Sequence, residues 1–116
     1  MAELRERLEP LDLRVVDASV LLLIADRTNL TSSDIGKVLD IQRANMVPLL
    51  NRLEAAQLVE RKPIDRKSQA IVLSATGREC HAEVLRITGQ FEHDLLERIP
   101  PEHRGHLVPA LQALLG

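Results

Sequence analysis

Residues 30–78 read LTSSDIGKVLDIQRANMVPLLNRLEAAQLVERKPIDRKSQAIVLSATGR, and the order of patterns in this stretch predicts the fold. Two short helical patterns come first, and two strand-like runs then flank the charged tip Pro63-Ile64-Asp65-Arg66-Lys67. A helix, a tight turn, a second helix and a two-stranded wing form a winged helix-turn-helix. This arrangement presents one helix and one loop to a nucleic-acid duplex, so we expect a nucleic-acid-binding fold.

The first helical pattern begins at Thr31, a candidate N-cap residue. Asp34 lies three residues on, in the capping-box position. Asp40 follows where a tight turn needs a residue that tolerates left-handed backbone, which Asp does less easily than Gly. The residues therefore predict a capped helix that ends in a tight turn.

The second helical pattern, residues 42–56, has an apolar face and an outward face. The apolar residues repeat at i, i+3, i+4 and i+7 and are Met46, Leu49, Leu50 and Leu53. We expect the opposite face to meet base edges and phosphates, and it carries Ala44, Asn45, Pro48 and Arg52. Pro48 lies beyond the first turn and removes a backbone hydrogen bond, which predicts a local bend.

Two apolar or alternating runs after this helix predict a β-hairpin. They span residues 58–62 and 69–73, and the segment 63–68 between them is short enough for a hairpin tip. A two-stranded hairpin is only marginally stable alone, so it must pack on the helices.

Helical patterns flank this stretch on both sides. Residues 4–8 predict a short helix that Pro10 ends, and residues 15–25 predict a mostly buried helix. Ser74 is a candidate cap for a long helix that spans residues 75–98.

The long helix carries two apolar stripes, which imply two packing partners. The first stripe is Cys80, Val84, Ile87, Phe91 and Leu95, and the second is Leu85, Thr88, Leu96 and Ile99. Pro100-Pro101 ends this helix, and Pro101 or Glu102 begins another apolar helix. We therefore expect the C-terminal third to be a dimerisation module, the alternative being a monomeric helical hairpin packed on the core.

Together these elements predict a single domain of 116 residues, mainly α with a small β-hairpin (α+β). Residues 15–73, approximately, form the winged-helix lobe, and residues 1–14 and 74–116 form dimerisation helices. With one Phe and no Trp or Tyr, the core must consist of Leu, Val, Ile and Ala.

The distribution of charge supports a nucleic-acid partner although the net charge does not. The chain has a net charge of −2, which argues against such a partner. Residues 37–67, however, hold seven basic and four acidic side chains, a local excess of +3 on the predicted second helix and wing. This patch can hold phosphates, although an ordinary solvated run of charges would look the same.

Other kinds of chemistry find little support. The single cysteine, Cys80, excludes an intrachain disulfide, and the absence of a signal-peptide pattern or long apolar run predicts a cytoplasmic protein without a membrane partner. We expect no metal or other cofactor, because no ligands at metal spacing accompany the histidines His81, His93, His103 and His106. Without a phosphate loop, nucleophile elbow or paired carboxylates, the chain is not expected to be an enzyme. We interpret Cys80 as an inert thiol rather than an oxidation sensor.

Four motifs, in order and spacing, resemble the MarR family of bacterial winged-helix transcription regulators. They are Leu30-Thr31 with Ile35-Gly36, Arg52-Leu53-Glu54 with Leu58-Val59-Glu60-Arg61, the wing motif Asp65-Arg66-Lys67, and Leu73-Ser74-Ala75-Thr76-Gly77-Arg78 at the start of the long helix. The resemblance extends from about residue 11 to residue 115.

The resemblance implies a homodimer whose recognition helices, residues 42–56, enter successive major grooves of a pseudo-palindromic operator in double-stranded DNA. Many members are repressors that leave DNA when a small ligand binds between the DNA-binding lobe and the dimerisation helices. Carried onto this chain, the family pattern places Ala44, Asn45 and Pro48 against the bases. The wing, residues 63–68, would place Arg66 in the minor groove, with Asp65 orienting Arg66 through a charge-assisted hydrogen bond.

The sequence departs from the family pattern in four ways. A polar or basic residue is common where Pro48 stands, so base readout shifts toward Gln42, Arg43 and Asn45. Gln42 replaces the usual Ser or Thr cap, the wing is about two residues shorter, and the long N-terminal helix is nearly absent. Affinity would then rest on Arg66, Lys67 and other basic residues that face phosphates, with Arg52 among the DNA-binding candidates.

The leading hypothesis is therefore a sequence-specific DNA-binding regulator, a ligand-responsive homodimeric repressor. The alternative is a winged-helix protein-interaction module without independent DNA binding, which Pro48, the short wing and the short N-terminus favour. The ligand site is not identified from the sequence. With Phe91 as its one aromatic residue, the chain suggests an aliphatic-walled pocket, with Arg14, Arg86 and His81 as candidate partners for a carboxylate.

Overall fold

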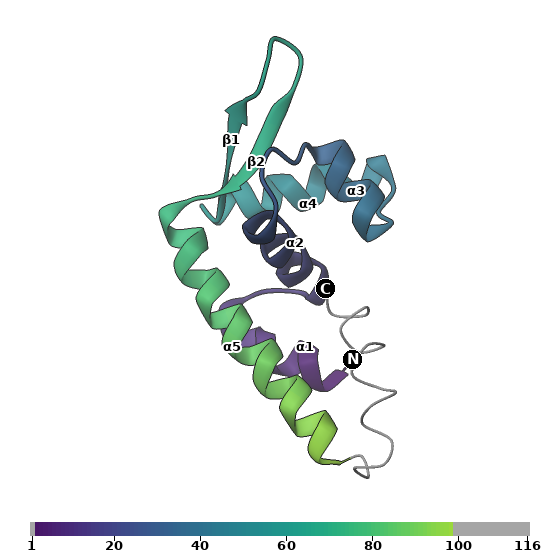
Figure 1. The fold of residues 1–116 in the computed structure, drawn as a ribbon, viewed down its shortest axis with the longest axis vertical. Coiled ribbons are helices and arrows are strands. Elements are labelled where there is room, and N and C mark those ends of the chain that lie inside the picture. The colour runs from purple at the N-terminus through teal and green to yellow at the C-terminus, as the bar shows by residue number, and fades with distance from the viewer. Residues whose placement is uncertain (1, 99–116) are drawn as a thin grey trace.

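A computed structural model describes residues 2–98 of the protein, and this part is mainly helical with one antiparallel hairpin. The winged helix-turn-helix class predicted from the sequence is confirmed (Figure 1). In chain order the elements are α1 (Ala2–Leu8), a 3-10 turn (Glu9–Leu11), α2 (Val15–Asp26), α3 (Ser32–Leu39), α4 (Arg43–Ala55), β1 (Val59–Pro63), β2 (Gln69–Leu73) and α5 (Ala75–Glu97).

The start and end of α3 follow the predicted local chemistry. The Thr31 hydroxyl accepts the Asp34 N–H at 3.1 Å, and the Asp34 carboxylate accepts the Thr31 N–H at 3.0 Å. These hydrogen bonds hold the pKa of Asp34 below its usual value. Asp40 ends the helix with a left-handed φ of 55°. The capping box and the tight turn at Asp40 are both confirmed.

The hairpin begins one residue later than expected. Gln57 adopts a left-handed φ of 62°, and the Leu58 N–H donates to the Leu53 carbonyl at 3.0 Å, so Leu58 closes α4 instead of opening β1. The ladder then pairs Val59 with Leu73 and Pro63 with Gln69. The predicted first strand, residues 58–62, is therefore shifted by one position, whereas the second strand is confirmed.

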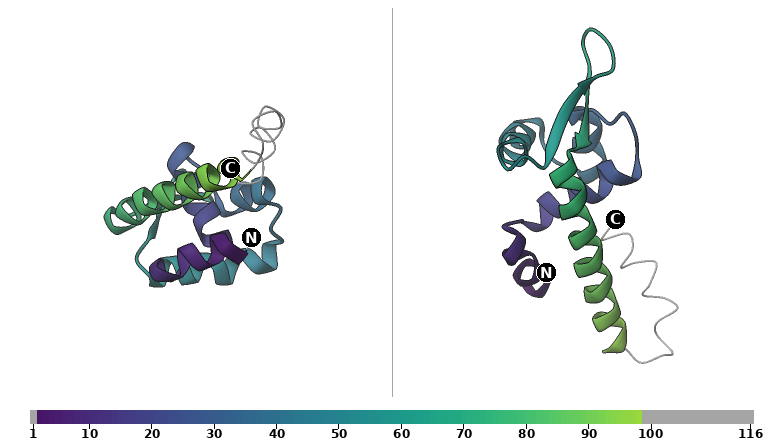
Figure 2. Two further views of the ribbon diagram at one scale, coloured as in Figure 1. Left: turned by 90° about the horizontal axis from the view of Figure 1, so that it is seen from below. Right: turned by 90° about the vertical axis from the view of Figure 1, so that its left-hand side faces the viewer.

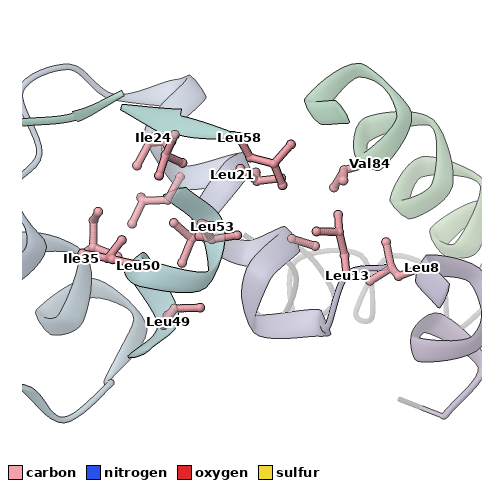
Figure 3. Packing of buried hydrophobic residues seen from close by; sticks show 14 of the residues in the cluster. Leu8, Leu13, Leu21, Ile24, Ile35, Leu49, Leu50, Leu53, Leu58 and Val84 are labelled. Carbon is pink, nitrogen blue, oxygen red and sulfur yellow. The ribbon is translucent and has the colours of Figure 1, made fainter. Parts of the chain in front are cut away.

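One apolar core joins the helix-turn-helix to α5. Val20 and Leu21 of α2 are fully buried, as is Val84 of α5, and Leu50 of α4 is almost so. Figure 3 shows the labelled side chains running from Ile35 and Leu50 at one end to Val84 and Leu8 at the other. Because this core continues from α4 into α5, the recognition helix and the long helix rest on a common base.

The long helix α5 runs away from the hairpin, and α1 lies beside it (Figures 1 and 2). The first predicted stripe is confirmed, since its central residues Val84, Ile87 and Phe91 are buried and its ends are half-buried. In the second stripe Leu85 is 51% exposed, and Ile99 lies outside the described residues, as does the helix predicted after Pro101. The short N-terminal helix is confirmed, and the chain continues through Pro10 as a 3-10 turn.

Four charged side chains connect α1 to α5. The Arg7 guanidinium donates to Asp94 at 2.7 Å and to Glu3 at 2.8 Å, and it lies 5.4 Å from the centre of the Phe91 ring. Arg98 donates twice to Glu3, each time at 3.0 Å. Arg98 and then Arg7 lower the pKa of Glu3 from 4.5 to about 2, and Arg7 also lowers that of Asp94.

We expect acid to weaken this attachment of α1. Because the pKa of Glu3 is depressed in the folded chain, its carboxylate stabilises the fold above about pH 4.5, and that contribution is lost as the pH falls toward 2. The difference in free energy of unfolding between the protein and Glu3→Gln should therefore shrink over that range, measured by urea unfolding followed by circular dichroism. Glu6→Gln is the control, because Glu6 is exposed on the same helix and makes no ion pair within residues 2–98. A difference for Glu3→Gln that stays constant with pH would contradict the expectation.

Candidate nucleic-acid interface

The recognition helix α4 has two stripes of opposite character. Met46, Leu49, Leu50 and Leu53 are buried, as the periodicity predicts. The outward stripe consists of four exposed residues at the same i, i+3, i+4, i+7 spacing: Ala44, Val47, Pro48 and Asn51. Val47 and Asn51 were not among the predicted site residues, although the spacing from Ala44 would have revealed them.

The first residues of α4 are also exposed. Gln42 is the N-cap residue, and its carbonyl accepts the N–H groups of Asn45 and Met46 at 2.9 and 3.1 Å. Its side chain makes no capping bond, and the side chains of Gln42, Arg43 and Asn45 all reach solvent. The three polar residues predicted to read bases thus lie together at the start of the helix.

Pro48 is accommodated within α4, which extends from Arg43 to Ala55 without interruption. Its side chain is exposed and belongs to the outward stripe. The local bend expected from the missing hydrogen bond stays a prediction.

Arg52 requires a correction. It was expected on the outward face, but its Nη2 donates to the carboxylate of Asp17, which is only 2% exposed at the start of α2. The other oxygen of that carboxylate accepts the Arg14 N–H at 2.8 Å. The buried carboxylate determines this orientation, because a charge inside the core must be paired. The Arg52 guanidinium therefore attaches α4 to α2, and sequence patterns gave no sign of the partner.

The wing is closed by Asp65, though not in the predicted manner. One carboxylate oxygen of Asp65 accepts the backbone N–H groups of Lys67 and Ser68, both at 2.8 Å, and the Ile64 N–H donates to the Ser68 carbonyl at 2.9 Å. In the described chain Asp65 makes no hydrogen bond to the Arg66 side chain. In a tight turn, an Asp carboxylate accepts hydrogen bonds from nearby backbone N–H groups more readily than it pairs with the flexible guanidinium of the next residue. Asp65 thus orders the tip of the wing rather than Arg66 directly.

The cations of the wing are exposed. Neither Arg66 nor Lys67 takes part in an ion pair among residues 2–98. In the middle of β1, Arg61 Nε donates to Glu54 of α4 at 2.7 Å, which connects the first strand to the recognition helix. The hairpin projects past α3 and α4 (Figure 1), so its tip presents unpaired positive charge beyond the helices.

Three hollows in the described part of the chain are lined by no residue of the outward stripe or of the wing tip, residues 63–68. One, of about 280 Å³, is lined by α1, the 3-10 turn and α5 and includes Leu11, Arg86 and Ile87. Another, of about 400 Å³, lies beside the Asp17–Arg52 pair and includes Arg14. Two of the candidate carboxylate partners, Arg86 and Arg14, thus line separate hollows, and His81 lines a third.

The other residues considered from the sequence are Cys80 and the histidines. Burial and then the charge of Glu83 raise the pKa of the half-buried Cys80 thiol, which lowers its reactivity. Within residues 2–98 no group of three His, Cys, Asp or Glu side chains is arranged to hold a metal ion, and His103 and His106 lie outside that range. None of the described helices is long and apolar enough to cross a membrane.

A helix-turn-helix, an outward helical stripe and a cationic hairpin define the winged helix-turn-helix class. The model of the MarR family matches residues 11–70, just over half of the sequence, and the chain belongs to this family. The "Putative transcriptional regulatory protein for hcr operon" of Thauera aromatica is 26% identical over 97 residues. The match covers 82% of this chain, which spans 58% of the length of that relative.

Several solved structures have a similar fold. Wild-type MarR from E. coli, in its apo form, is 26% identical with a TM-score of 0.81, covering 97% of this chain and 86% of MarR. S. aureus MepR in complex with DNA is 22% identical with a TM-score of 0.83, covering 98% and 85%. The Mycobacterium tuberculosis MarR family protein Rv2887 in complex with salicylic acid is 21% identical with a TM-score of 0.76, covering 97% and 85%.

Proposed function

We propose that the protein is a sequence-specific DNA-binding transcriptional regulator, acting in the cytoplasm as a homodimeric repressor that responds to a small molecule. The observation that carries the proposal is the exposed stripe on α4 together with the exposed cations Arg66 and Lys67 on the wing, which form no ion pair among residues 2–98. Membership of the MarR family supports it, as does the shared fold of MepR, which was solved with DNA. The proposed role involves no catalysis and no cofactor.

In this role α4 and the wing contact different grooves of the duplex. Residues 42–56 lie in the major groove, where Gln42, Arg43 and Asn45 hydrogen-bond to base edges or phosphates. The wing, residues 63–68, delivers Arg66 to the minor groove and Lys67 to a phosphate. Because the Arg61–Glu54 pair connects β1, the strand that leads into the wing, to α4, both parts approach the duplex together.

In this proposal α5 provides the dimer contact, and the hollow between α1 and α5 binds the ligand. Leu85 is 51% exposed on α5, which suits burial against a second subunit. The hollow between α1 and α5 is partly aliphatic and includes Arg86, which suits a small carboxylate, and the family member Rv2887 was solved with salicylic acid. A ligand would release DNA by favouring a dimer in which the spacing of the two α4 helices no longer matches one DNA turn.

Arg66→Ala tests the proposal through the salt dependence of binding. We expect about tenfold weaker binding to specific and non-specific duplexes alike, and a log–log salt slope shallower by about 1, because one DNA contact is lost. Fluorescence anisotropy with DNA from upstream of the protein's own gene measures both quantities. Arg86→Ala, which removes the same charge from α5, should leave the slope unchanged. Asn45→Ala should mainly reduce the preference for specific over non-specific DNA.

A winged-helix module that binds only other proteins is the second candidate. The apolar character of Ala44, Val47 and Pro48 on the outward stripe favours it, because exposed apolar residues in a row also fit a protein surface. A mobility shift at nanomolar protein in physiological salt would eliminate this candidate.

A further inference from the structure

The outward stripe of α4 is unusual in its chemistry. Three of its four residues, Ala44, Val47 and Pro48, have side chains that neither donate nor accept hydrogen bonds. Val47 is 57% exposed, although the same helix buries four other apolar side chains. Asn51 is the one residue of the stripe that can form hydrogen bonds. Exposed apolar residues are ordinary when scattered, but these three form a continuous line at helical spacing.

The surroundings of the stripe indicate a nucleic acid as its occupant. Arg43 lies at the start of the same helix, exposed and without an ion pair among the described residues, and the wing adds the exposed Arg66 and Lys67. Exposed cations on the same helix and on the wing, without ion pairs among residues 2–98, complement a polyanionic surface such as a duplex. A protein partner would need acidic groups as well as an apolar surface.

In the major groove, the thymine C5-methyl is the base-edge group best suited to apolar contact. The other groups that distinguish the base pairs are hydrogen-bond donors and acceptors, and an apolar side chain pressed against them leaves them without partners. A side chain such as Val47 therefore gains most where a thymine methyl lies opposite. Pro48 adds rigidity, since its ring fixes the local backbone and its side chain has no freedom to retreat.

We propose that Ala44, Val47 and Pro48 select thymine by apolar contact with its methyl group, so that each operator half-site has thymine opposite the middle of α4. This inference rests on the proposed DNA-binding function and names the bases that it reads. Gln42, Arg43, Asn45 and Asn51 then read the flanking positions by hydrogen bonds. Val47 is the principal residue of the three, because its exposed branched side chain offers the largest contact.

The experiment compares thymine with uracil, which has the same hydrogen-bonding groups but lacks the methyl. The full-length protein first selects its preferred duplex from a random DNA library. Each thymine of the selected half-site is then replaced singly by deoxyuridine, and affinities are measured by anisotropy. We expect one or two positions at which uracil weakens binding about fourfold, the effect of losing one buried methyl group.

Two variants assign the effect to a residue. Val47→Ala should bring the thymine-to-uracil affinity ratio close to 1 at one of those positions. Val38→Ala is the matched control, since Val38 is 44% exposed on α3 and its truncation should leave the ratio near four.

Three other results would contradict, respectively, the thymine inference, the role of Val47 and the DNA-binding function itself. Tight, specific binding that is indifferent to uracil at every position overturns the thymine inference and leaves the regulator proposal standing. Discrimination that persists undiminished in Val47→Ala overturns the assignment to Val47. Failure to select any duplex overturns both the inference and the proposed function, in favour of a protein occupant of the stripe.

Discussion

Replacement of Gly77 by alanine is expected to lower the free energy of unfolding by about 3 kcal/mol, at the upper end of the usual cost of overpacking. Gly77 is buried in the first turn of α5, and a Cβ there would lie 1.9 Å from the Leu58 carbonyl oxygen and 2.9 Å from its carbon. Both atoms are backbone, so they cannot rotate away. The Gly77 N–H also donates to the Ser74 hydroxyl at 2.9 Å, and the Ser74 N–H donates to the Leu58 carbonyl at 3.1 Å. Relief of the clash would therefore disturb the junction of α5 and the hairpin.

The same helix provides a control. Gly89 also lies in α5, but a Cβ there meets no atom of residues 2–98 within 4 Å. Gly89→Ala should raise the stability by up to about 1 kcal/mol, because alanine favours helix more than glycine. Urea unfolding followed by circular dichroism measures both variants. Equal stability of the two alanine variants would show that the contact between Gly77 and Leu58 does not constrain the junction.

Arg52→Ala is expected to cause the second large decrease in the free energy of unfolding. Its removal leaves the carboxylate of Asp17, 2% exposed, without its charged partner, and breaking a buried pair from one side costs about 3 kcal/mol. The side chain of Arg52 is itself 39% exposed, so water can reach part of the site and reduce this cost. Asp17 retains the bond from the Arg14 N–H, which is too little to compensate a full charge.

Arg61→Ala is the matched control for Arg52→Ala. The Arg61–Glu54 pair also joins two elements, but its side chains are 35% and 36% exposed, and such pairs contribute less than about 1 kcal/mol. Thermal unfolding compares the two variants. Salt titration of DNA binding separates the two roles considered for Arg52: a guanidinium engaged with Asp17 predicts an unchanged salt slope, and a slope shallower by about 1 would restore it to the DNA-contacting set.

The local features of the fold could be predicted because neighbouring residues specify them. The capping box of Thr31 and Asp34 closes within one helical turn, and Asp40 adopts left-handed backbone within a turn of its own chain. The buried stripe of α4 follows from a 3.6-residue period. The first strand was misplaced by one residue because the left-handed turn at Gln57 was not recognised.

The composition of the interface was harder to foresee. Gln42, Arg43, Ala44, Asn45 and Pro48 were placed on the exposed part of α4 because their spacing relative to the apolar residues is a local property. Val47 was missed because a valine within a helical pattern is expected to be buried, although its spacing of three residues from Ala44 places it on the outward face.

The order of elements, the caps and the apolar periods of this chain were thus set by residues within a few positions of one another. Contacts between distant residues required the packed structure. Arg52 turns to Asp17, 35 positions away, because a buried carboxylate must be neutralised, and Gly77 is needed because the Leu58 backbone passes directly over it. Such requirements arise when helices and the hairpin share one core, since desolvation and close contact depend on which surfaces meet in space.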